Sequence, residues 1–425
     1  MNYAELVAYL DRSWTKGPDV GTVDSFPFDE LRGFLAARGN PQDGLRVVHV
    51  TGSKGKGSVV TMAAALLRAH GLPAGTFTGP HLVYVEERIG QGSGPPIDRE
   101  ELASRLTELI GASERLGQNV HAIWRLLLVA ALEHFRDTGL RYAAIEVGRG
   151  GRFDGTNVLD GDVACIAPIG LEHVPRLGRT TAEIAAQKVA IVKPGRTCIS
   201  APQPPDVAAV IEAGVALAGG RLVRLGREAG LDVRLLDRTG VVADLRTPHR
   251  TFADVRISLL GRHQAENACV ALCAVEELLA AEGRHVDPDA VRRALAAVRW
   301  PGRLEVLHDA PLLVYDGAHT AESAAVLAEA LRDHFPGVRW TFVVGLLTRR
   351  DADAMLRALA TVGDAVVCVP VPGFESMDPA RVASRAEAAG LRARVAGSVR
   401  EALAEAGSVD VCITGSLYLY QQLEE

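Results

Sequence analysis

Residues 46–67, RVVHVTGSKGKGSVVTMAAALL, join an apolar run to a run of helical period through a loop that contains three glycines. This order predicts a strand, a glycine-rich turn and a helix, the arrangement of a phosphate-binding loop. Glycines leave backbone N–H groups open to phosphate oxygens, and the following helix adds the positive end of its dipole. In such a loop Lys56 would reach the terminal phosphates of a nucleotide, and Ser58 would bind Mg²⁺.

The spacing of this loop departs from the standard phosphate loop. The standard form, G-x-x-x-x-G-K-[ST], has a longer spacer between its first glycine and its Gly-Lys pair. Here two residues, Ser53 and Lys54, fill that place. The alternative is a flexible surface turn rich in glycine, serine and lysine. The strand and helix patterns on either side favour the phosphate loop.

The size and composition of the chain limit the classes of protein to consider. At 425 residues the chain is long for one hydrophobic core, so we expect two domains. An apolar share of 48% and a charged share of 23% are typical of a soluble globular protein, and a net charge of -6 does not indicate a nucleic-acid partner. The N-terminus lacks a basic segment followed by an apolar one, and no later stretch offers about 18 uncharged apolar residues. We therefore expect neither export nor a membrane span.

The cysteines indicate a reducing compartment. They are scattered, mostly within apolar runs, and form no CxxC pair. This pattern predicts buried free thiols in the cytoplasm rather than a disulfide or zinc framework. The six positions are Cys165, Cys198, Cys269, Cys273, Cys368 and Cys412.

Short β-branched runs alternate with longer segments of helical period, which predicts an α/β protein with a largely parallel sheet. Between 221 and 262 the pattern changes to short alternating pieces, which predict antiparallel ribbons added to the first domain. The sequence Trp300-Pro301-Gly302 ends a helix and begins a second α/β series, so we place the domains at 1–298 and 299–425. The predicted strands lie within 46–50, 142–148, 163–170, 311–317, 341–347, 365–371 and 409–416, and the predicted helices are 59–70, 99–115, 122–138, 181–191, 263–282, 320–334 and 378–389.

Two predicted strands end in polar residues that would lie near the phosphate loop. Glu146 stands where IEVGRGGRFDGTNVL leaves a strand, and His173 stands just past the next strand, in IAPIGLEHVPRLG. Ligands of open parallel sheets bind at the carboxyl ends of strands, so both side chains would share a crevice with the loop. The plain alternatives are that Glu146 caps a glycine turn and that His173 is a hydrogen-bonded loop residue. Together with Ser58 they form a set of ligands for a hard metal ion.

Three more residues stand at the ends of predicted elements. Lys188 lies near the end of a predicted helix, where a solvated cation favourable to the helix dipole is the plain interpretation. Asp316 and His319 lie between a strand and a helix in VYDGAHTAES. Asp316 suits a contact with a ribose hydroxyl, and His319 suits a base or a phosphate. The alternative is an ordinary Asp-Gly turn followed by a histidine before a helix.

Nine motifs occur in one order along the chain: HVTGSKGKGS, GPHL with EERI, EVGRGGRFDGTNV, GLEH, QKVAIVKPG, LLGRHQAENA, WPGRLE, DGAHT and GSLYL. Their order and spacing, from about residue 45 to the C-terminus, resemble those of folylpolyglutamate and dihydrofolate synthases in the Mur ligase superfamily. The resemblance implies an N-terminal ATP-binding domain with a Mur-ligase-like parallel sheet, helices on its faces and a small antiparallel addition. It also implies a C-terminal, Rossmann-like α/β domain of the glutamate-ligase type.

The same resemblance implies an ADP-forming amide ligase. ATP would phosphorylate a substrate carboxylate, and the amino group of L-glutamate would then attack the acyl phosphate. The first hypothesis is a folylpolyglutamate synthase, with or without dihydrofolate synthase activity. One alternative is a paralogue that uses the same chemistry on another carboxylic acid in a specialised pathway, and another is a nucleotide-binding protein that has lost catalysis. The family also implies a monomer whose two domains close on ATP and exclude water from the acyl phosphate.

The resemblance further implies roles for individual residues. Lys56, Glu146, His173 and Lys188 are the implied catalytic residues, with Lys188 carrying a carbamate formed from CO₂. Implied ligands of two Mg²⁺ ions are Ser58, Glu146, His173 and the modified Lys188. The implied ATP contacts are Gly52, Ser53, Gly55, Lys56, Gly57, Ser58, Asn267, Arg303, Asp316 and His319.

Several positions depart from the commonest bacterial pattern of this family. Gly79 stands where relatives have a serine that contacts Mg²⁺, so Thr78 or a water would take that coordination place, or the metal site is altered. Trp124 and Arg125 stand where relatives have an aromatic residue followed by Glu or Thr, and the stretch before residue 40, including 22–33, matches their pterin side only loosely. Gly79 and Arg125 favour the paralogue. Three other substitutions resemble variants of eukaryotic-type synthases: Lys54, Gln187 and Thr320.

Overall fold

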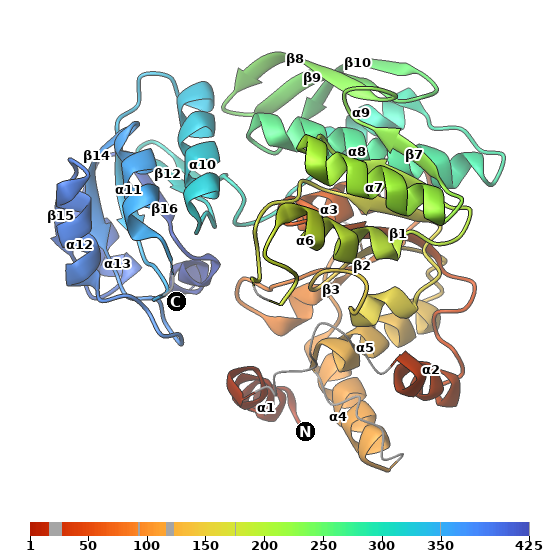
Figure 1. Ribbon diagram of the computed structural model, residues 1–425. Coiled ribbons are helices and arrows are strands. Elements are labelled where there is room, and N and C mark those ends of the chain that lie inside the picture. The colour runs from red at the N-terminus through yellow and green to blue at the C-terminus, as the bar shows by residue number, and fades with distance from the viewer. Residues whose placement is uncertain (17–27, 92–93, 116–122, 175, 349, 425) are drawn as a thin grey trace. The chain divides into compact units, whose positions relative to one another are not determined.

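The chain forms two compact units, which the computed structural model describes over residues 1–16, 28–91, 94–115, 123–174, 176–348 and 350–424 (Figure 1). The first unit comprises Met1–Asp232, Ala243–Val255 and Ala265–Val298, and the second comprises Val233–Val242, Arg256–Gln264 and Arg299–Glu425. Two sequence predictions extend beyond the described residues. They are position 122 of the predicted helix 122–138 and positions 22–27 of the stretch compared with the pterin side of the family.

A seven-stranded sheet forms the centre of the first unit, in the order β3-β2-β4-β1-β5-β6-β7. Neighbouring strands are parallel, except that β3 runs antiparallel to β2. Strand β1 (Arg46–Thr51) is buried after its first residue, as expected for a parallel strand covered on both faces. The predicted, largely parallel sheet is therefore confirmed. The other strands are β2 (Ala74–Phe77), β3 (Ile89–Gly90), β4 (Tyr142–Glu146), β5 (Val163–Ile166), β6 (Thr197–Ser200) and β7 (Arg221–Arg224).

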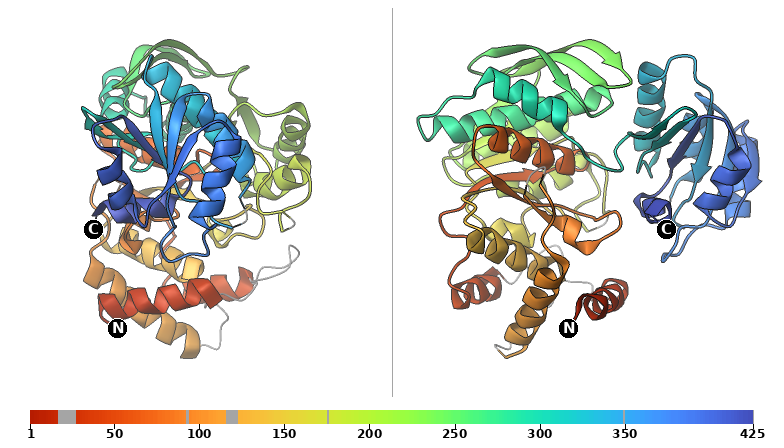
Figure 2. Two further views of the ribbon diagram at one scale, coloured as in Figure 1. Left: turned by 90° about the vertical axis from the view of Figure 1, so that its left-hand side faces the viewer. Right: turned by 180° about the vertical axis from the view of Figure 1, so that it is seen from behind.

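Helices cover this sheet, and two apolar clusters hold them to it. Helix α3 packs against β1, β2, β4 and α9, and all its residues from Ser58 to Leu67 are buried. One cluster joins α1, α2, α4 and α5 to the sheet, and the other joins α6 and α7 to it (Figure 2). The predicted helix 181–191 ends at Lys188 and continues as a 3₁₀ turn, Val189–Ile191. The helices of this part of the chain are α1 (Tyr3–Lys16), α2 (Phe28–Ala37), α3 (Lys56–Ala69), α4 (Arg99–Arg115), α5 (Ile123–Asp137), α6 (Thr181–Lys188), α7 (Pro205–Leu217), α8 (Arg262–Ala280) and α9 (Pro288–Ala297), with 3₁₀ turns at Val85–Arg88 and Gly155–Val158.

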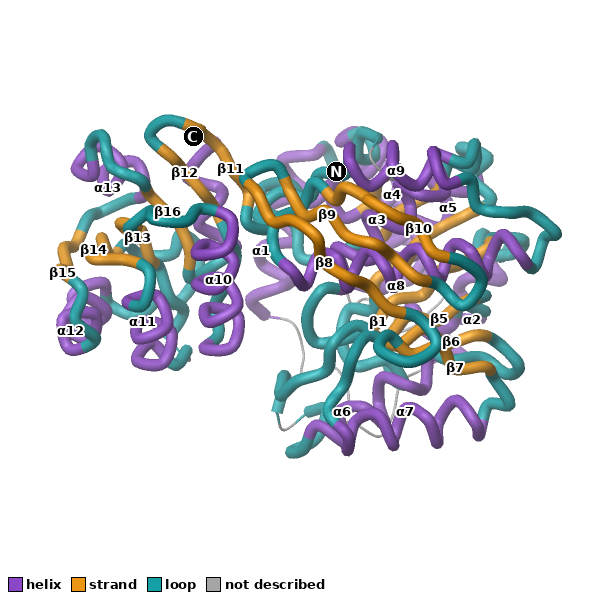
Figure 3. The backbone as a smooth tube through the Cα atoms, turned by 90° about the horizontal axis from the view of Figure 1, so that it is seen from above, coloured by secondary structure: helices purple, strands orange, loops and turns teal. Residues whose placement is uncertain are grey.

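A separate three-stranded sheet consists of β8 (Gly230–Asp237), β9 (Gly240–Arg246) and β10 (Thr251–Ile257), in the order β10-β9-β8 (Figure 3). The connections between these strands are too short for a parallel crossover, so neighbouring strands are antiparallel. The predicted ribbon at 221–226 was wrong. Arg221–Arg224 is β7, which pairs in parallel with β6 at the edge of the seven-stranded sheet. An edge strand is partly exposed, and this exposure produced the alternating pattern.

The second unit contains a six-stranded sheet in the order β11-β12-β16-β13-β14-β15. Its strands are parallel except β11, which runs antiparallel to β12. The predicted α/β fold of this part of the chain is confirmed. The strands are β11 (Glu305–Asp309), β12 (Leu312–Tyr315), β13 (Trp340–Val344), β14 (Gly363–Cys368), β15 (Arg392–Val395) and β16 (Val411–Thr414), and the helices are α10 (Ala321–His334), α11 (Ala352–Ala360), α12 (Pro379–Ala388), α13 (Val399–Ala406) and α14 (Gln421–Glu424), with a 3₁₀ turn at Leu417–Tyr420.

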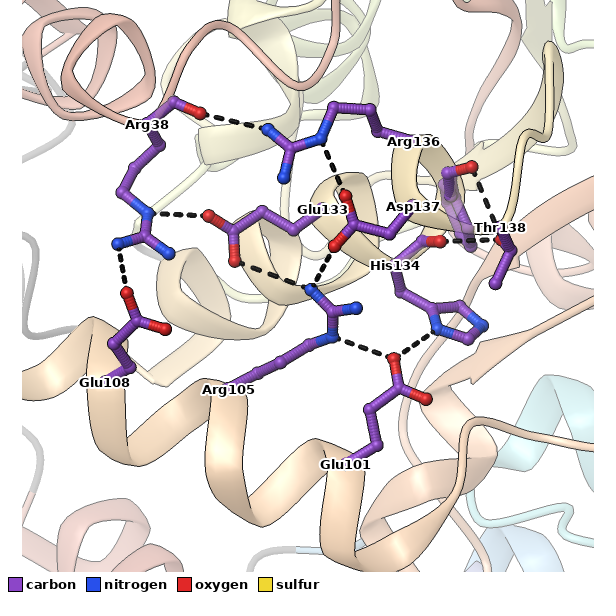
Figure 4. Close-up of polar contacts among 10 residues, drawn as sticks. Arg38, Glu101, Arg105, Glu108, Glu133, His134, Arg136, Asp137 and Thr138 are labelled. Carbon is purple, nitrogen blue, oxygen red and sulfur yellow. Dashed lines mark hydrogen bonds and ion pairs between the residues drawn. The ribbon is translucent and has the colours of Figure 1, made fainter.

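A network of ion pairs ties the end of α2 to α4 and α5 (Figure 4). Its centre is Glu133, whose side chain is only 3% exposed and accepts a hydrogen bond from Arg38 Nε at 2.6 Å. Arg38 also pairs with Glu108, at 2.6 Å, and Arg105 pairs with Asp137 at 2.9 Å. A buried carboxylate is stable only when it is paired, so this network fixes the three helices relative to one another.

The remaining expectations concern the thiols and membrane insertion. All six cysteines are buried and free, as predicted. Within the described ranges, no helix has the length and apolarity that a bilayer crossing requires.

Candidate active site

The predicted phosphate loop connects β1 to α3, and contacts with the chain after β5 hold it in place. Gly52 has φ +148°, and a Cβ on this residue would lie 2.7 Å from the Cβ of Ala167. The N–H of Ser53 donates to the carbonyl of Pro168 at 2.8 Å, and the Ser53 hydroxyl donates to the Gly170 carbonyl at 3.0 Å. The Gly170 N–H in turn donates to that hydroxyl at 3.1 Å. The side chain of Ser53 therefore shapes the loop.

Gly55 ends the loop in the left-handed region, with φ +81°, directly before α3. A Cβ on Gly55 would lie 2.6 Å from Oδ1 of Asn267, a buried residue of α8. The structure thus brings Asn267 next to the loop, although more than 200 residues separate the two in the chain. Because Gly55 has no side chain to cap α3, the N–H groups of the first helical turn point towards the loop without a competing side chain. Gly57 and Ser58 lie in this first turn, and Ser58 is buried.

Lys56, the first residue of α3, meets Glu146 at the end of β4. The distance from Lys56 Nζ to Glu146 Oε1 is 3.6 Å, and the Glu146 side chain is 6% exposed. The Gly79 N–H donates to the other carboxylate oxygen, Oε2, at 3.3 Å. Strands β1 and β4 are parallel neighbours, with Val50 opposite Glu146, so the loop after β1 and the end of β4 lie at the same sheet edge. This is the juxtaposition that the carboxyl ends of parallel strands produce.

Lys188 is buried, in contrast to the solvated cation that the plain interpretation expected. Its Nζ lies 2.6 Å from Oε1 of Glu172 and donates to the carbonyl of Gly52 at 2.9 Å. The side chain of Lys188 is 1% exposed. Burial lowers the pKa of Lys188 to about 8, although the Glu172 carboxylate opposes this shift. The packing of α6 against the sheet and α7 is what removes this amine from water.

Glu172 was not singled out from the sequence. Burial acts to raise its pKa, but the charges of Lys188 and Lys56 outweigh burial and lower it. Glu172 is therefore an anion that lies within the field of both lysines. The GLEH motif contained it beside His173, and its position just past β5 was the signal that could have identified it.

His173 has a positive φ of 49°, which is uncommon for a residue with a side chain. Its carbonyl accepts hydrogen bonds from the N–H groups of Arg176 and Leu177, at 2.7 and 3.2 Å, which hold this turn. Burial lowers the pKa of His173, so its imidazole is neutral and can donate a lone pair to a metal ion.

The donor set at this sheet edge fits a hard cation. Ser58 offers a hydroxyl and Glu146 a buried carboxylate, the oxygen ligands that Mg²⁺ prefers. Thr78 is buried beside Gly79, and its N–H donates to the Arg88 carbonyl at 2.9 Å. No group of three or more His, Cys, Asp or Glu side chains in the described residues is close enough to hold a metal ion by itself. A cation here would therefore need further oxygen ligands, which nucleotide phosphates supply.

Arg303, Asp316 and His319 lie close together in the second unit. Asp316 directly follows β12, and its two carboxylate oxygens accept hydrogen bonds from the N–H groups of Leu304 and Ala318, both at 2.8 Å. Arg303 Nη1 donates to the carbonyl of Gly302 at 3.2 Å, and His319 Nδ1 lies 2.8 Å from the Gly317 carbonyl. Leu304 has φ +43°, so the bond from Asp316 stabilises a strained turn. This structural role of Asp316 was not predicted.

Comparisons with known proteins agree with this geometry. Residues 50–275 match the family model of the Mur ligase middle domain, and residues 302–416 match that of the Mur ligase, glutamate ligase domain. The folylpolyglutamate synthase of Lacticaseibacillus casei is 33% identical over 99% of this chain and 97% of that protein. The dihydrofolate synthase/folylpolyglutamate synthase of Mycobacterium tuberculosis is 34% identical over 87% of this chain and 80% of that protein.

Solved structures lead to the same family. A Mycobacterium tuberculosis folylpolyglutamate synthase complexed with ADP has a TM-score of 0.89 and 30% identity, covering 99% of this chain and 97% of that one. An FPGS–AMPPCP–folate complex has a TM-score of 0.84 and 31% identity, covering 100% and 99%. Two family models and relatives matched over nearly their full length leave one assignment. The chain belongs to the folylpolyglutamate synthase and dihydrofolate synthase family of the Mur ligases, which are ligases that form carbon–nitrogen bonds.

Proposed function

We propose that this protein is an ATP-dependent, ADP-forming ligase that adds L-glutamate to a folate carboxylate through an acyl phosphate. The observation that carries the proposal is the pairing of Lys56 with Glu146 beside the phosphate loop, in a chain that matches a folylpolyglutamate synthase over 99% of its length. A dihydrofolate synthase activity on the same site is part of this proposal, because relatives that are named for both activities match most of the chain.

The phosphate loop would bring the nucleotide and the acceptor carboxylate together. Transfer of a γ-phosphoryl group to a carboxylate brings anions together, and their repulsion must be offset. Lys56 and the N–H groups of the first turn of α3 would hold the β- and γ-phosphates, along with Gly52, Ser53, Gly55 and Gly57. Glu146, Ser58 and His173 would hold Mg²⁺, which supplies positive charge to the phosphates when it is bound. The other nucleotide contacts in the proposal are Asn267, Arg303, Asp316 and His319.

We assign carbamylation by CO₂ to Lys188. Only a neutral amine attacks CO₂, and burial lowers the pKa of Lys188 to about 8, so a useful fraction of it is neutral near physiological pH. A carbamate would be an anion beside the Glu172 carboxylate, where an ammonium now lies 2.6 Å away. Two adjacent anions repel each other. The modification is therefore stable only with a cation between them, which supports a second Mg²⁺ site at this place.

The proposal extends to the organisation of the chain. Residues 1–298 would form the ATP-binding domain, and residues 299–425 the glutamate-ligase domain. The family models for the middle and glutamate ligase domains, at 50–275 and 302–416, support this division. We also propose a monomer in the cytoplasm, where the six buried free cysteines would stay reduced.

A second candidate is a paralogue that joins an amino acid to another carboxylic acid. Two observations favour it. Gly79 has no room for the serine of relatives, because a Cβ there would lie 2.8 Å from Arg88 Nη1. Arg125 is buried in α5, where relatives have Glu or Thr, and burial lowers its pKa. A buried cation of this kind would select an acidic group on the acceptor.

The experiment uses purified protein with ATP, Mg²⁺, L-glutamate and tetrahydrofolate. We expect phosphate release only when both acceptor substrates are present, with a folate product that is one glutamate longer by mass spectrometry. Dihydropteroate in place of tetrahydrofolate tests the dihydrofolate synthase activity. Phosphate release that requires glutamate but proceeds equally without any folate or pteroate would contradict the first proposal and favour the paralogue.

A further inference from the structure

The indole of Trp124 lies between two glycines that flank Glu146. Trp124 is the second residue of α5, and its ring packs on Phe77 with the ring centroids 4.5 Å apart. A Cβ on Gly148 would lie 2.6 Å from Cε2 of the indole, and a Cβ on Gly79 would lie 3.0 Å from its Cζ3. Carbon atoms that are not bonded do not approach to 2.6 Å, so Gly148 cannot carry a side chain while the indole keeps its position.

Arg88 forms the other side of the space next to Gly79. Its guanidinium lies over the Trp124 ring, 5.7 Å from the centroid, and its Nε donates to Nδ1 of His81 at 2.9 Å. Burial, together with the charge of Arg88, lowers the pKa of His81 to about 3, so the imidazole is neutral and accepts this bond. The indole is thus held between Phe77 and a fixed guanidinium.

No hydrogen bond within the described residues holds the indole. Nε1 of Trp124 is buried and has no partner there. A buried N–H without a partner is unfavourable, so packing must stabilise this ring position by more than the unpaired group costs. The shape of the ring, rather than its N–H group, is what this place in the structure uses.

The contacts of the indole lead to the reacting groups in two steps. The N–H of Gly79 donates to Oε2 of Glu146, and Oε1 of Glu146 lies 3.6 Å from Nζ of Lys56. Gly148 lies two residues after Glu146 on the same turn. A displacement of the indole would therefore move the backbone on both sides of this carboxylate.

We propose that Trp124 is a positioning residue of the ligase reaction, which holds Gly79 and Gly148 and thereby fixes the Glu146 carboxylate beside Lys56. The inference rests on the proposed function, because it gives Glu146 a role in nucleotide and metal binding. It also accounts for glycine at position 79, since the indole and Arg88 occupy the volume that a serine side chain would need.

The test is a double-variant cycle on the full-length protein, with the Kd for Mg·ATP as the readout. Gly148→Ala pushes the indole away, and Trp124→Ala removes it, so we expect each to raise the Kd about tenfold. In Gly148→Ala/Trp124→Ala the methyl group fits the empty space, so its Kd should not exceed that of Trp124→Ala. Trp124→Phe keeps a flat ring without the unused N–H and should stay within about threefold of the parent protein.

Trp340 provides the matched control. It is a buried tryptophan of β13 that packs edge-on against Phe335, with centroids 5.4 Å apart, and its Nε1 also has no partner in the described residues. Trp340→Phe should lower the unfolding midpoint and leave the Kd for Mg·ATP unchanged. In the ligase assay, Trp124→Ala should raise the KM for Mg·ATP and leave the KM for glutamate unchanged, which a loss of stability alone would not do.

Two results would overturn the proposal: a Kd for Mg·ATP that Trp124→Ala leaves unchanged, or fully additive effects in the double variant. If Trp124→Ala does not fold, the pair Gly148→Ala and Gly148→Ala/Trp124→Phe gives the same cycle, because phenylalanine vacates the atoms nearest Gly148. Mg·ATP binding needs no acceptor. A protein that shows this coupling but does not extend folate would refute the proposed function and leave the role of Trp124 intact.

Discussion

Nζ of Lys188 lies 2.6 Å from Oε1 of Glu172, and both side chains are withdrawn from water at the foot of the phosphate loop. The carboxylate favours the ammonium form of the amine, whereas burial favours the neutral form. Burial prevails, and the pKa of Lys188 falls from 10.5 to about 8. The pair therefore stands near the pH at which the amine becomes able to react with CO₂.

The carbamate on Lys188 should depend on pH in a defined direction. The neutral amine becomes more abundant as pH rises through about 8, so carbamate formation should increase over that range. Glu172→Gln removes the charge that opposes the shift, so the midpoint should move to lower pH. The measurement is the ¹³C NMR signal of the protein in ¹³C-bicarbonate with Mg²⁺. Lys193→Gln removes another amine, one that is bonded to the Asn157 carbonyl at 2.8 Å, and should leave the signal intact. A signal that survives Lys188→Arg would exclude this site.

Removal of the ammonium of Lys56 should abolish most of the turnover. Lys56→Met leaves Glu146 without its partner at 3.6 Å and removes the positive charge that faces the γ-phosphate. We expect kcat/KM for ATP to fall by about 10²–10³-fold. Lys54→Met, in the same loop, is the control and should change kcat/KM by less than about fivefold. Equal losses in both variants would show that the loop needs only its overall charge.

The loop should also require glycine at position 55 for a steric reason. In Gly55→Ala the new methyl would meet Asn267 Oδ1 at 2.6 Å, so either the loop or α8 must shift. We expect the Kd for ATP to rise about tenfold or more. Gly71→Ala separates the steric effect from backbone strain, because Gly71 has φ +76° with nothing within 4 Å. This control should cost about 1 kcal/mol of stability and leave ATP binding unchanged. Calorimetric titration and thermal unfolding of both variants check the two expectations.

The ion-pair network around Glu133 should contribute strongly to stability. Arg38→Ala leaves Glu133 with Arg105 at 3.8 Å, and we expect a loss of about 2–3 kcal/mol in the free energy of unfolding. Arg32→Ala breaks an exposed pair with Asp29 and should cost less than about 0.5 kcal/mol. Urea unfolding of both variants measures the difference. Comparable losses would mean that the burial of Glu133 is of no consequence.

The effect of Arg38→Ala should also depend on pH. The hydrogen bond from Arg38 lowers the pKa of Glu108 below its ordinary value of 4.5. A carboxylate whose pKa is lowered by folding stabilises the protein above pH 4.5 and loses that contribution as pH falls through its folded pKa. The gap in stability between the parent protein and Arg38→Ala should therefore narrow below pH 4.5. A gap that stays constant down to pH 3 would contradict this.

Predictions from the sequence were most accurate where the signal was local. The predicted helix 99–115 matches α4, and the strand–loop–helix order at 46–67 matches β1 and α3, because periodicity and glycine content act over a few neighbouring residues. Helices α1, α2, α7 and α9 were not predicted. Their amphipathic faces pack on partners that are distant in the chain, such as α4 for α1 and α3 for α9. The mistaken ribbon at 221–226 has the same origin, since only the sheet order shows that Arg221–Arg224 is an edge strand.

The sequence by itself determined the fold class and the family, because ordered motifs and hydrophobic periods are properties of the chain. Tertiary structure alone decided the environments of individual side chains. A lysine in the last turn of a helix is expected to be solvated, yet Lys188 is buried against Glu172. A glycine is expected to allow a turn, yet Gly148 is required by the indole of Trp124. Burial, pKa and steric room depend on atoms contributed by distant segments, and no local pattern contains them.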